Sequence, residues 1–125
     1  MNPSSTPLPL ARLKTLLADL NRARIGVVGD FCVDSYYIVD VEASEPSLET
    51  GVSTRPVREQ RQTLGGAGNV MANLHALGVT QLSAFAVIGD DINGRELLRL
   101  LSERNVDTSG LVKQSEGWMT NTYLK

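Results

Sequence analysis

The chain has 125 residues, of which 42% are hydrophobic and 21% are charged, as is typical of a soluble globular protein with one hydrophobic core. Twelve basic and fourteen acidic residues give a formal net charge of −2, which argues against nucleic acid as a partner. With one cysteine (Cys32) and one histidine (His75), the sequence excludes an intramolecular disulfide and favours no zinc site.

The sequence shows no targeting or membrane signal. Its N-terminal residues lack the basic segment and long apolar stretch of a signal peptide. The longest nearly apolar run, residues 82–88, is far too short to span a bilayer. We therefore expect a cytoplasmic protein without a membrane partner.

The first 23 residues are interpreted as an N-terminal tail followed by an amphipathic helix. Residues 1–7 are rich in serine and proline and are expected to be disordered. From Leu8 onward, leucines recur at the spacing of one helical face, and this face needs a partner surface. They are Leu10, Leu13, Leu16, Leu17 and Leu20.

Residues 24–125 are expected to form the main domain. Residues 24–29 are continuously apolar after Arg24 and predict a strand buried on both faces of a parallel sheet. Residues 35–41 predict a second strand. The polar stretch at 42–63, with Pro46 and Pro56, is interpreted as an exposed strand pair or flap.

The second half of the chain alternates helices and strands. A glycine-rich stretch at 65–68 opens a helix that ends at Gly78. A strand follows at 82–88, and then a helix capped by Asp91 or Asn93 with an apolar face of leucines. Residues 106–112 predict a connector with a short strand, and 119–125 an extended segment. This alternation predicts an α/β fold with a mostly parallel sheet.

Two carboxylates follow the first predicted strand. Asp30 and Asp34 lie where open α/β sheets bind their ligands, beyond the carboxyl ends of the strands, and both could accept hydrogen bonds from sugar hydroxyls. The alternative is structural: Asp30 would satisfy turn amides and Asp34 would cap the next segment. Taken alone, this motif slightly favours the structural role.

The glycine-rich stretch is the second candidate site. Gly65 and Gly66 allow a ligand to approach the backbone, and Asn69 offers both a donor and an acceptor in the first helical turn. A tight turn without a ligand explains the same residues equally well. A dinucleotide fingerprint fits poorly, because Met71 stands where its third glycine belongs and the preceding residues do not form a buried strand.

The remaining polar clusters favour structural roles. Residues 89–94 form a turn and a helix cap, and Gly89, Asp90 and Gly94 are interpreted as structural. Three arginines of the flap could meet an anionic substrate group or could equally form a solvated surface. They are Arg55, Arg58 and Arg61.

Four segments occur in an order that resembles the ribokinase-like PfkB carbohydrate kinases: IGVVGDFCVD, TLGGAGNVMANLHALG, AVIGDDINGRELLRLL and NVDTSGL. The resemblance covers nearly all of the chain from Arg24 onward, and the flap looks closest to that of bacterial heptose-phosphate kinases. Two departures are Met71, where the family usually has a small residue, and a flap that lacks the Pro-rich run of the heptose kinases.

The resemblance implies a ribokinase-like αβα sandwich with a small β-lid at about residues 35–63, of which this chain would be the N-terminal portion. It implies that the substrate, a sugar or sugar phosphate, contacts Asp30, Asp34, Gly65, Gly66 and Asn69. Lys125 lies in a strand that approaches the substrate in the family, and the lid often forms a homodimer contact.

The same resemblance bears on catalysis. The family's catalytic base is the aspartate of a G-A-G-D motif that does not occur here, so the base and the site for ATP and Mg²⁺ are expected beyond Lys125. We expect an ATP-dependent carbohydrate kinase in the intact protein and little activity or tight nucleotide binding in this chain alone. The alternative is a non-catalytic sugar-binding or regulatory remnant of the family.

Overall fold

A computed structural model describes residues 7–125, so the predicted disorder of residues 1–6 lies outside the described residues. The elements follow the order α1 (Leu10–Asp19), a 3₁₀ turn (Leu20–Arg22), β1 (Arg24–Val28), β2 (Phe31–Val39), β3 (Val57–Gly66), α2 (Ala67–Ala76), β4 (Gln81–Gly89), α3 (Ile92–Ser102), β5 (Asp107–Gln114) and β6 (Thr122–Leu124). The predicted alternation of helices and strands is confirmed.

The first of two sheets is parallel, with the strand order β1-β4-β5. Side chains alternate between its faces, and one face carries Leu82, Ala84 and Ile88, which are at most 3% exposed. Helices α2 and α3 add Met71, Leu97 and Leu101, which are fully buried, and the start of β2 and the end of β3 add Phe31, Val33 and Leu64. The leucine pattern predicted for the second of these helices thus marks its buried face.

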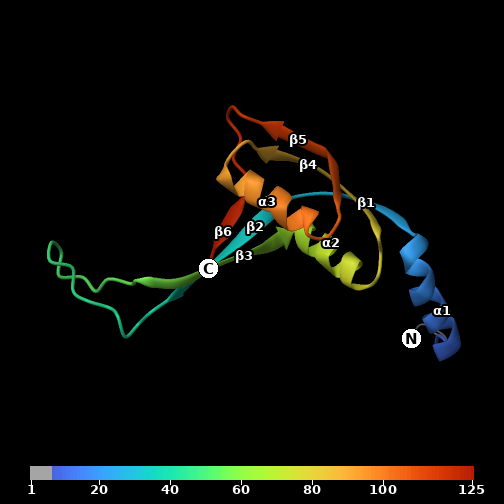
Figure 1. Cartoon of the computed structure of the whole chain (residues 1–125), viewed down its shortest axis with the longest axis horizontal. Helices are drawn as coiled ribbons and strands as arrows, with labels where there is room; N and C mark the ends of the chain where they lie inside the picture. Colours follow the sequence, from blue (N-terminus) through green and yellow to red (C-terminus); the bar gives the residue numbers. More distant parts are fainter. Residues whose placement is uncertain (1–6) are drawn as a thin grey trace, which may run out of the picture.

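The second sheet is mixed and has the order β3-β2-β6. Strands β2 and β3 are the antiparallel arms of a hairpin that extends away from the rest of the molecule, and β6 runs parallel to β2 (Figure 1). Strand β2 begins at Phe31, four residues before the predicted start, because Phe31 and Val33 are buried and pair with Gly66 and Leu64. The prediction of a mostly parallel sheet therefore holds for the first sheet only.

The helix ends follow from local chemistry. The Asp91 carboxylate caps α3 by accepting a hydrogen bond from the Gly94 amide at 2.7 Å, which decides between the two predicted caps. After α2, Gly78 takes a φ of +96°, as a C-terminal glycine does. His75 is exposed on α2.

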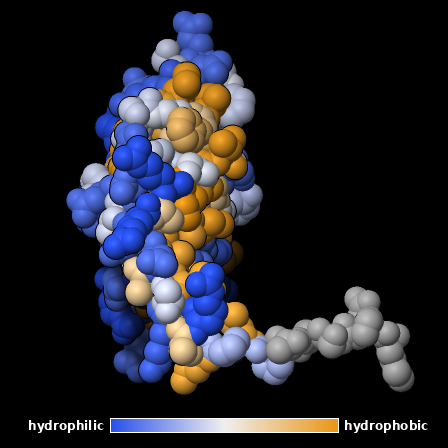
Figure 2. Space-filling model, turned by 90° about the vertical axis from the view of Figure 1, so that its right-hand side faces the viewer, coloured by the Kyte–Doolittle hydropathy of each residue, from blue (hydrophilic) through white to orange (hydrophobic). Residues whose placement is uncertain are grey.

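The described helices α2 and α3 leave the other face of the parallel sheet uncovered. Phe85 is 43% exposed there and Val28 82% exposed. In α1 no residue is buried, so no described element covers the leucine face for which a partner surface was predicted. Figure 2 shows hydrophobic residues gathered in a band along one side of the molecule. Between residues 7 and 125, no helix has the length and apolar character needed to cross a membrane.

Candidate sugar-binding site

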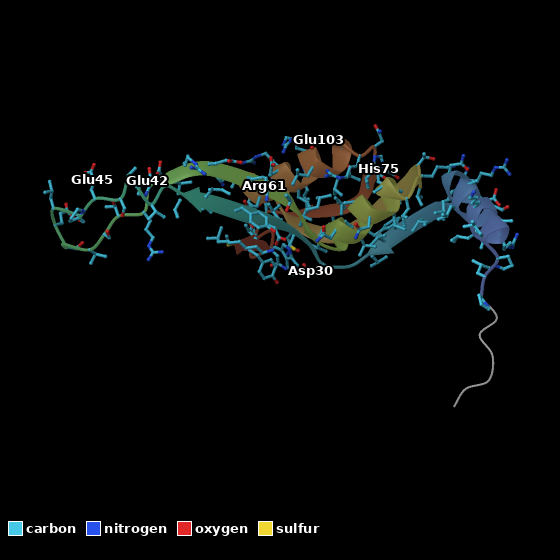
Figure 3. All side chains as sticks on the ribbon, turned by 90° about the horizontal axis from the view of Figure 1, so that it is seen from below. Asp30, Glu42, Glu45, Arg61, His75 and Glu103 are labelled. Atoms are coloured by element: carbon cyan, nitrogen blue, oxygen red, sulfur yellow. The ribbon has the colours of Figure 1, made fainter. Side chains whose placement is uncertain are left out.

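The two predicted carboxylates lie at the base of the β2–β3 hairpin. Asp30 is exposed in the link between β1 and β2, and Asp34 lies within β2, with its side chain 13% exposed. Figure 3 shows Asp30 at the base of the hairpin and Glu42 and Glu45 toward its tip. The turn from β1 into β2 thus brings both carboxylates beyond the carboxyl end of a strand of the parallel sheet.

Gly65 and Gly66 form the neighbouring wall, and both positions require glycine. A β-carbon at Gly65 would lie 2.6 Å from Cys32 Sγ and 3.0 Å from Asp34 Oδ1. Gly66 has a φ of +50°, and a β-carbon there would collide with the Asp30 carbonyl oxygen. The glycine stretch therefore lets the β3 backbone lie directly against the two aspartates.

The start of α2 completes this wall. The Ala67 amide donates a hydrogen bond to the Asp30 carbonyl oxygen at 2.8 Å, which ties the first turn of the helix to the aspartate link. Asn69 lies exposed in the same turn. Asn69 follows the glycines closely in the sequence, but its side chain forms no hydrogen bond among the described residues.

The two residues that flank β6 supply partners for both carboxylates. Asn121 Nδ2 donates to Asp30 Oδ1 at 2.8 Å, and Lys125 Nζ forms an ion pair with Asp34 Oδ2 at 2.7 Å. Among the described residues, neither carboxylate accepts a hydrogen bond from a backbone amide. The alternative in which Asp30 satisfies turn amides and Asp34 caps a segment is therefore wrong for this structure.

Asn121 is a residue that the sequence interpretation missed. The segment 119–125 was predicted only as extended, and Lys125 alone was connected with the substrate. The available signal was the run of polar residues 120–122 directly before the last strand, since polar side chains at a strand end often line a site.

A row of aromatic and basic side chains lies next to Asp34. The Tyr36 ring has the Arg61 guanidinium 5.1 Å and the Lys125 ammonium 5.2 Å from its centroid, distances at which cations and rings attract. Arg61 is the β3 partner of Tyr36 in the register, and Tyr36 lies two residues beyond Asp34. All of these side chains consequently share one face of the hairpin.

Local charges and burial shift two ionisable groups in this cluster. The hydrogen bond to Asp34 raises the pKa of Lys125, which keeps the ammonium charged. Burial raises the pKa of the Cys32 thiol, and the charges of Asp30 and Asp34 raise it further. Cys32 is therefore a neutral packing residue beneath Gly65 and not a reactive thiolate.

The predicted structural role of residues 89–94 agrees with the contacts. A β-carbon at Gly89 would collide with the Asp91 carboxylate, and one at Gly94 would collide with the Gly89 carbonyl oxygen. The dinucleotide hypothesis fails on topology, because β3, which precedes the glycines, pairs antiparallel with β2 and does not belong to the parallel sheet.

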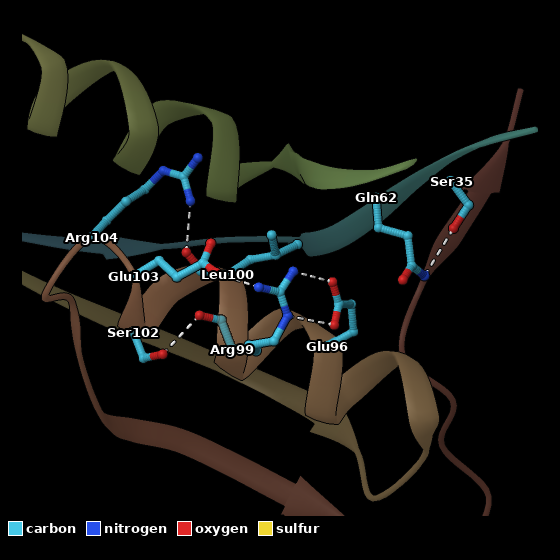
Figure 4. A network of polar contacts seen from close by, with 8 residues as sticks. All are labelled: Ser35, Gln62, Glu96, Arg99, Leu100, Ser102, Glu103 and Arg104. Atoms are coloured by element: carbon cyan, nitrogen blue, oxygen red, sulfur yellow. Dashed lines mark hydrogen bonds and ion pairs between the residues drawn. The ribbon is translucent and has the colours of Figure 1, made fainter. Parts of the chain in front are cut away.

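A separate cavity of about 590 Å³ lies against the opposite face of the hairpin. Ser35 and Gln62 line it from the second sheet, and Glu96 and Arg99 from α3 (Figure 4). Ser35 is the neighbour of Asp34 in β2, so the two side chains point to opposite faces of the strand. The cavity is thus distinct from the carboxylate site.

Three comparisons with known proteins give the context of this geometry. The family model described as "pfkB family carbohydrate kinase" matches residues 25–125. The chain belongs to the pfkB family of carbohydrate kinases. Its four ordered motifs and the hairpin with its two aspartates are thus features of a family member, and the predicted ribokinase-like α/β fold is confirmed.

Curated relatives carry the name bifunctional protein HldE. The protein from Wolinella succinogenes is 40% identical over 99 residues, which cover 79% of this chain and 20% of the relative. The protein from Mesorhizobium japonicum is 36% identical over 121 residues, or 97% of this chain and 23% of the relative. The chain thus spans about a fifth of the length of these relatives.

Solved structures give the same fold. An uncharacterized sugar kinase from Pyrococcus horikoshii is 30% identical with a TM-score of 0.56, covering 82% of this chain and 30% of that one. The same kinase is also known in complex with ATP. A fructokinase from Xylella fastidiosa, 24% identical over 81% of this chain and 27% of its own, has a TM-score of 0.56 and supports the fold alone.

Proposed function

We propose that this chain supplies the sugar-binding part of an ATP-dependent carbohydrate kinase, which transfers the γ-phosphoryl group of ATP to a sugar hydroxyl. The observation that carries the proposal is the pair of aspartates at the hairpin base, which lie against a backbone that has no side chains at Gly65 and Gly66. Carboxylates are strong acceptors for hydroxyl donors, and a glycine wall leaves room for a sugar ring. The hairpin would then act as the lid of the site.

The contacts support different proposed roles for the two aspartates. Asp34 is the more buried, and its Oδ2 is held by Lys125, so Oδ1 beside Gly65 is the oxygen available to a hydroxyl. Asp30 is exposed, and Asn121 fixes its orientation through Oδ1. Asn69 would add an amide at the start of α2, where the helix dipole also favours negatively charged groups.

The nucleotide and its Mg²⁺ are proposed to bind outside the described residues. Phosphoryl transfer depends on charge stabilisation around the transferred group, and bound Mg²⁺ supplies this when present. The residues described here would bind and orient the sugar. The predicted homodimer through the hairpin stays a prediction.

A phosphorylated sugar fits this site better than a neutral one. Arg61 and Lys125 bring two positive charges to the face that carries Asp34, and both lie over the Tyr36 ring. Guanidinium and ammonium groups are the usual partners of phosphate oxygens. We therefore infer that the substrate carries an anionic group on the side of the hairpin.

Sugar binding can be measured on this chain by NMR titration with neutral pentoses, hexoses and heptoses and with their phosphates. We expect a binding sugar to shift the amide signals of Gly65, Gly66 and Asn69, and Asp34→Ala to abolish these shifts. Asp107→Asn is the matched control, because Asp107 lies at the start of β5, at the opposite end of the strands. If no sugar moves these signals in the folded wild-type chain, the proposal is wrong.

The charge preference has its own test. Arg61→Gln should weaken binding of a sugar phosphate by about tenfold, the loss of one charge-assisted hydrogen bond, and leave binding of the neutral sugar unchanged. Arg55→Gln, a change of the same charge in the tip of the hairpin, should alter neither. An equal loss for both ligands would show that Arg61 supports the hairpin and does not recognise phosphate.

A further inference from the structure

A buried polar junction lies behind the carboxylate site, where the segment 118–121 meets the start of α3. The Asp91 carboxylate uses both of its oxygens there: Oδ1 accepts from the Gly94 amide at 2.7 Å, and Oδ2 accepts from the Thr120 amide at 2.8 Å. Thr120 is 3% exposed, and its hydroxyl accepts a hydrogen bond from the Gly89 amide at 2.9 Å. One side chain thus joins the cap of α3 to the backbone that leads into β6.

This junction lies next in sequence to the groups that hold the two aspartates. Asn121, directly after Thr120, donates to Asp30, and its carbonyl oxygen accepts from the Val33 amide at 3.0 Å. Four residues later, Lys125 contacts Asp34, and its amide donates to the Ser35 carbonyl oxygen at 2.9 Å. The position of β6 along β2 therefore determines whether either contact forms.

Strand β6 has few other attachments. It has three residues, Tyr123 is 54% exposed and Leu124 is 71% exposed, so little apolar burial holds it in place. Its register on β2 pairs Thr122 with Val33 and Leu124 with Ser35. A shift by one residue would reverse the side chains relative to the sheet and remove Lys125 from Asp34.

We infer that Asp91 is a positioning residue: it fixes Thr120 and thereby sets the register of β6, so that Asn121 and Lys125 reach Asp30 and Asp34. The inference rests on the proposed function for the importance of those two aspartates. The junction itself is a property of the fold, and it can be tested without any sugar.

Asp91→Asn separates the two tasks of this side chain. Asparagine is as good a helix cap as aspartate, so its oxygen can still accept from Gly94. Its amide nitrogen is a donor and cannot accept from the Thr120 amide. The variant has one acceptor oxygen where aspartate has two, so it cannot satisfy the Gly94 and Thr120 amides together; with that oxygen at Gly94, α3 stays capped and the link to β6 is broken. Asp107→Asn is the matched control, since Asp107 also accepts from a backbone amide, that of Ser109 at 3.0 Å, far from β6.

Amide hydrogen exchange of the full chain, measured by NMR, is the readout. In Asp91→Asn we expect about tenfold faster exchange at Val33, Tyr37 and Lys125, whose amides donate to or across β6. Amides that join β1 to β4 should keep their rates, and Asp107→Asn should change neither set. Uniformly faster exchange throughout the chain, or unchanged exchange along β6, would overturn the inference.

A second readout reports on the site itself. The titration of the Lys125 ε-carbon resonance reflects its contact with Asp34, so in Asp91→Asn its midpoint should return toward that of an ordinary lysine. If Asp91→Asn does not fold, Asp91→Ser takes its place: serine is also a good helix cap, but its single short side-chain oxygen cannot reach both the Gly94 and the Thr120 amides. Unchanged exchange along β6 in Asp91→Ser would also contradict the inference. A normal β6 with no sugar binding would instead contradict the proposed function alone.

Discussion

The base and the tip of the β2–β3 hairpin belong to one continuous ribbon but are held in different ways. At the base, residues 31–35 and 62–66, Val33 and Leu64 are at most 3% exposed and pack into the main core. At the tip, residues 40–56, contacts are local, such as the hydrogen bond from Thr54 Oγ1 to the Glu45 carbonyl oxygen at 2.9 Å. The base thus depends on the whole molecule, and the tip depends on itself.

This difference suits the proposed lid, in which one end holds the site and the other end is free to move. A site must be held precisely, and its candidate residues lie in the base or directly beside it, where α2, β6 and the hairpin meet. The tip can move or vary without disturbing them, because no described element outside the hairpin packs on it. Paired substitutions at the two ends measure the contrast directly.

The largest expected effect comes from removing a buried leucine. Leu64→Ala at the base should lower the free energy of unfolding by about 2–5 kcal/mol, because it leaves a cavity in the core. Leu48→Ala at the tip, where the side chain is fully exposed, should change it by less than about 0.5 kcal/mol. Urea denaturation followed by circular dichroism measures both. Similar losses would mean that the tip packs on the molecule after all.

Glycines at the two ends give a second, smaller contrast. Gly66→Ala combines a positive φ with a collision against the Asp30 carbonyl oxygen and should cost about 2–3 kcal/mol. Gly51→Ala also has a positive φ, +68°, but open space around it, and should cost about 1 kcal/mol. The difference between the two unfolding free energies isolates the collision. If the costs are equal, the backbone at Gly66 relaxes and the glycine wall is less rigid than the structure indicates.

Acid should weaken the junction between α3 and the segment that leads into β6, which lies against the base of the hairpin. Burial would raise the pKa of Asp91, but the hydrogen bonds from Thr120 and Gly94 outweigh it and hold the pKa below its ordinary value. Such a group stabilises the fold above the pKa of the unfolded chain, near about 4, and this stability is lost as the pH falls through the lower folded value.

The wild-type chain should therefore lose roughly 1 kcal/mol through Asp91 below about pH 4, a modest amount because the side chain is partly exposed. Urea midpoints measured over this pH range test it, with Asp91→Asn as the comparison, since this variant cannot titrate there. Glu96 and Asp107 also have lowered pKa values and remain in both proteins, so only the difference reports Asp91. Parallel pH curves for the two proteins would contradict the assignment.

The contrast also explains what the sequence could predict. Strand β1, α2 and its glycines follow from local patterns, although no residue of β1 is buried as its apolar run predicts. The nearness of the two aspartates to the glycine stretch follows only from the resemblance to the family. Asn121 and Lys125 each contact an aspartate 91 residues earlier, through a parallel pairing that no local pattern encodes. Their contribution needed the structure.

Helix α1 also shows what a local sequence pattern cannot predict. Its leucines recur at helical spacing, and the helix forms as predicted, but none of its residues is buried. The similar pattern in α3 buries Leu97, Leu100 and Leu101. Periodicity predicts which face of a helix is apolar, and the partner of that face depends on contacts with distant parts of the fold.

The smallest expected effect belongs to the Lys125–Asp34 ion pair, because the lysine side chain is 45% exposed and exposed pairs add little stability. Lys125→Met should therefore destabilise the chain less than Asp91→Asn does. The pH dependence has the opposite sign: the hydrogen bond to Asp34 raises the pKa of Lys125, so the contribution is complete below the ordinary value of 10.5 and is lost as the pH rises through the folded value. Thermal melts from neutral to alkaline pH measure this, and Lys113→Met on β5 should keep the wild-type curve. If Lys125→Met keeps the same alkaline loss as the wild-type chain, the ion pair is absent in solution and the base of the hairpin holds Asp34 by packing alone.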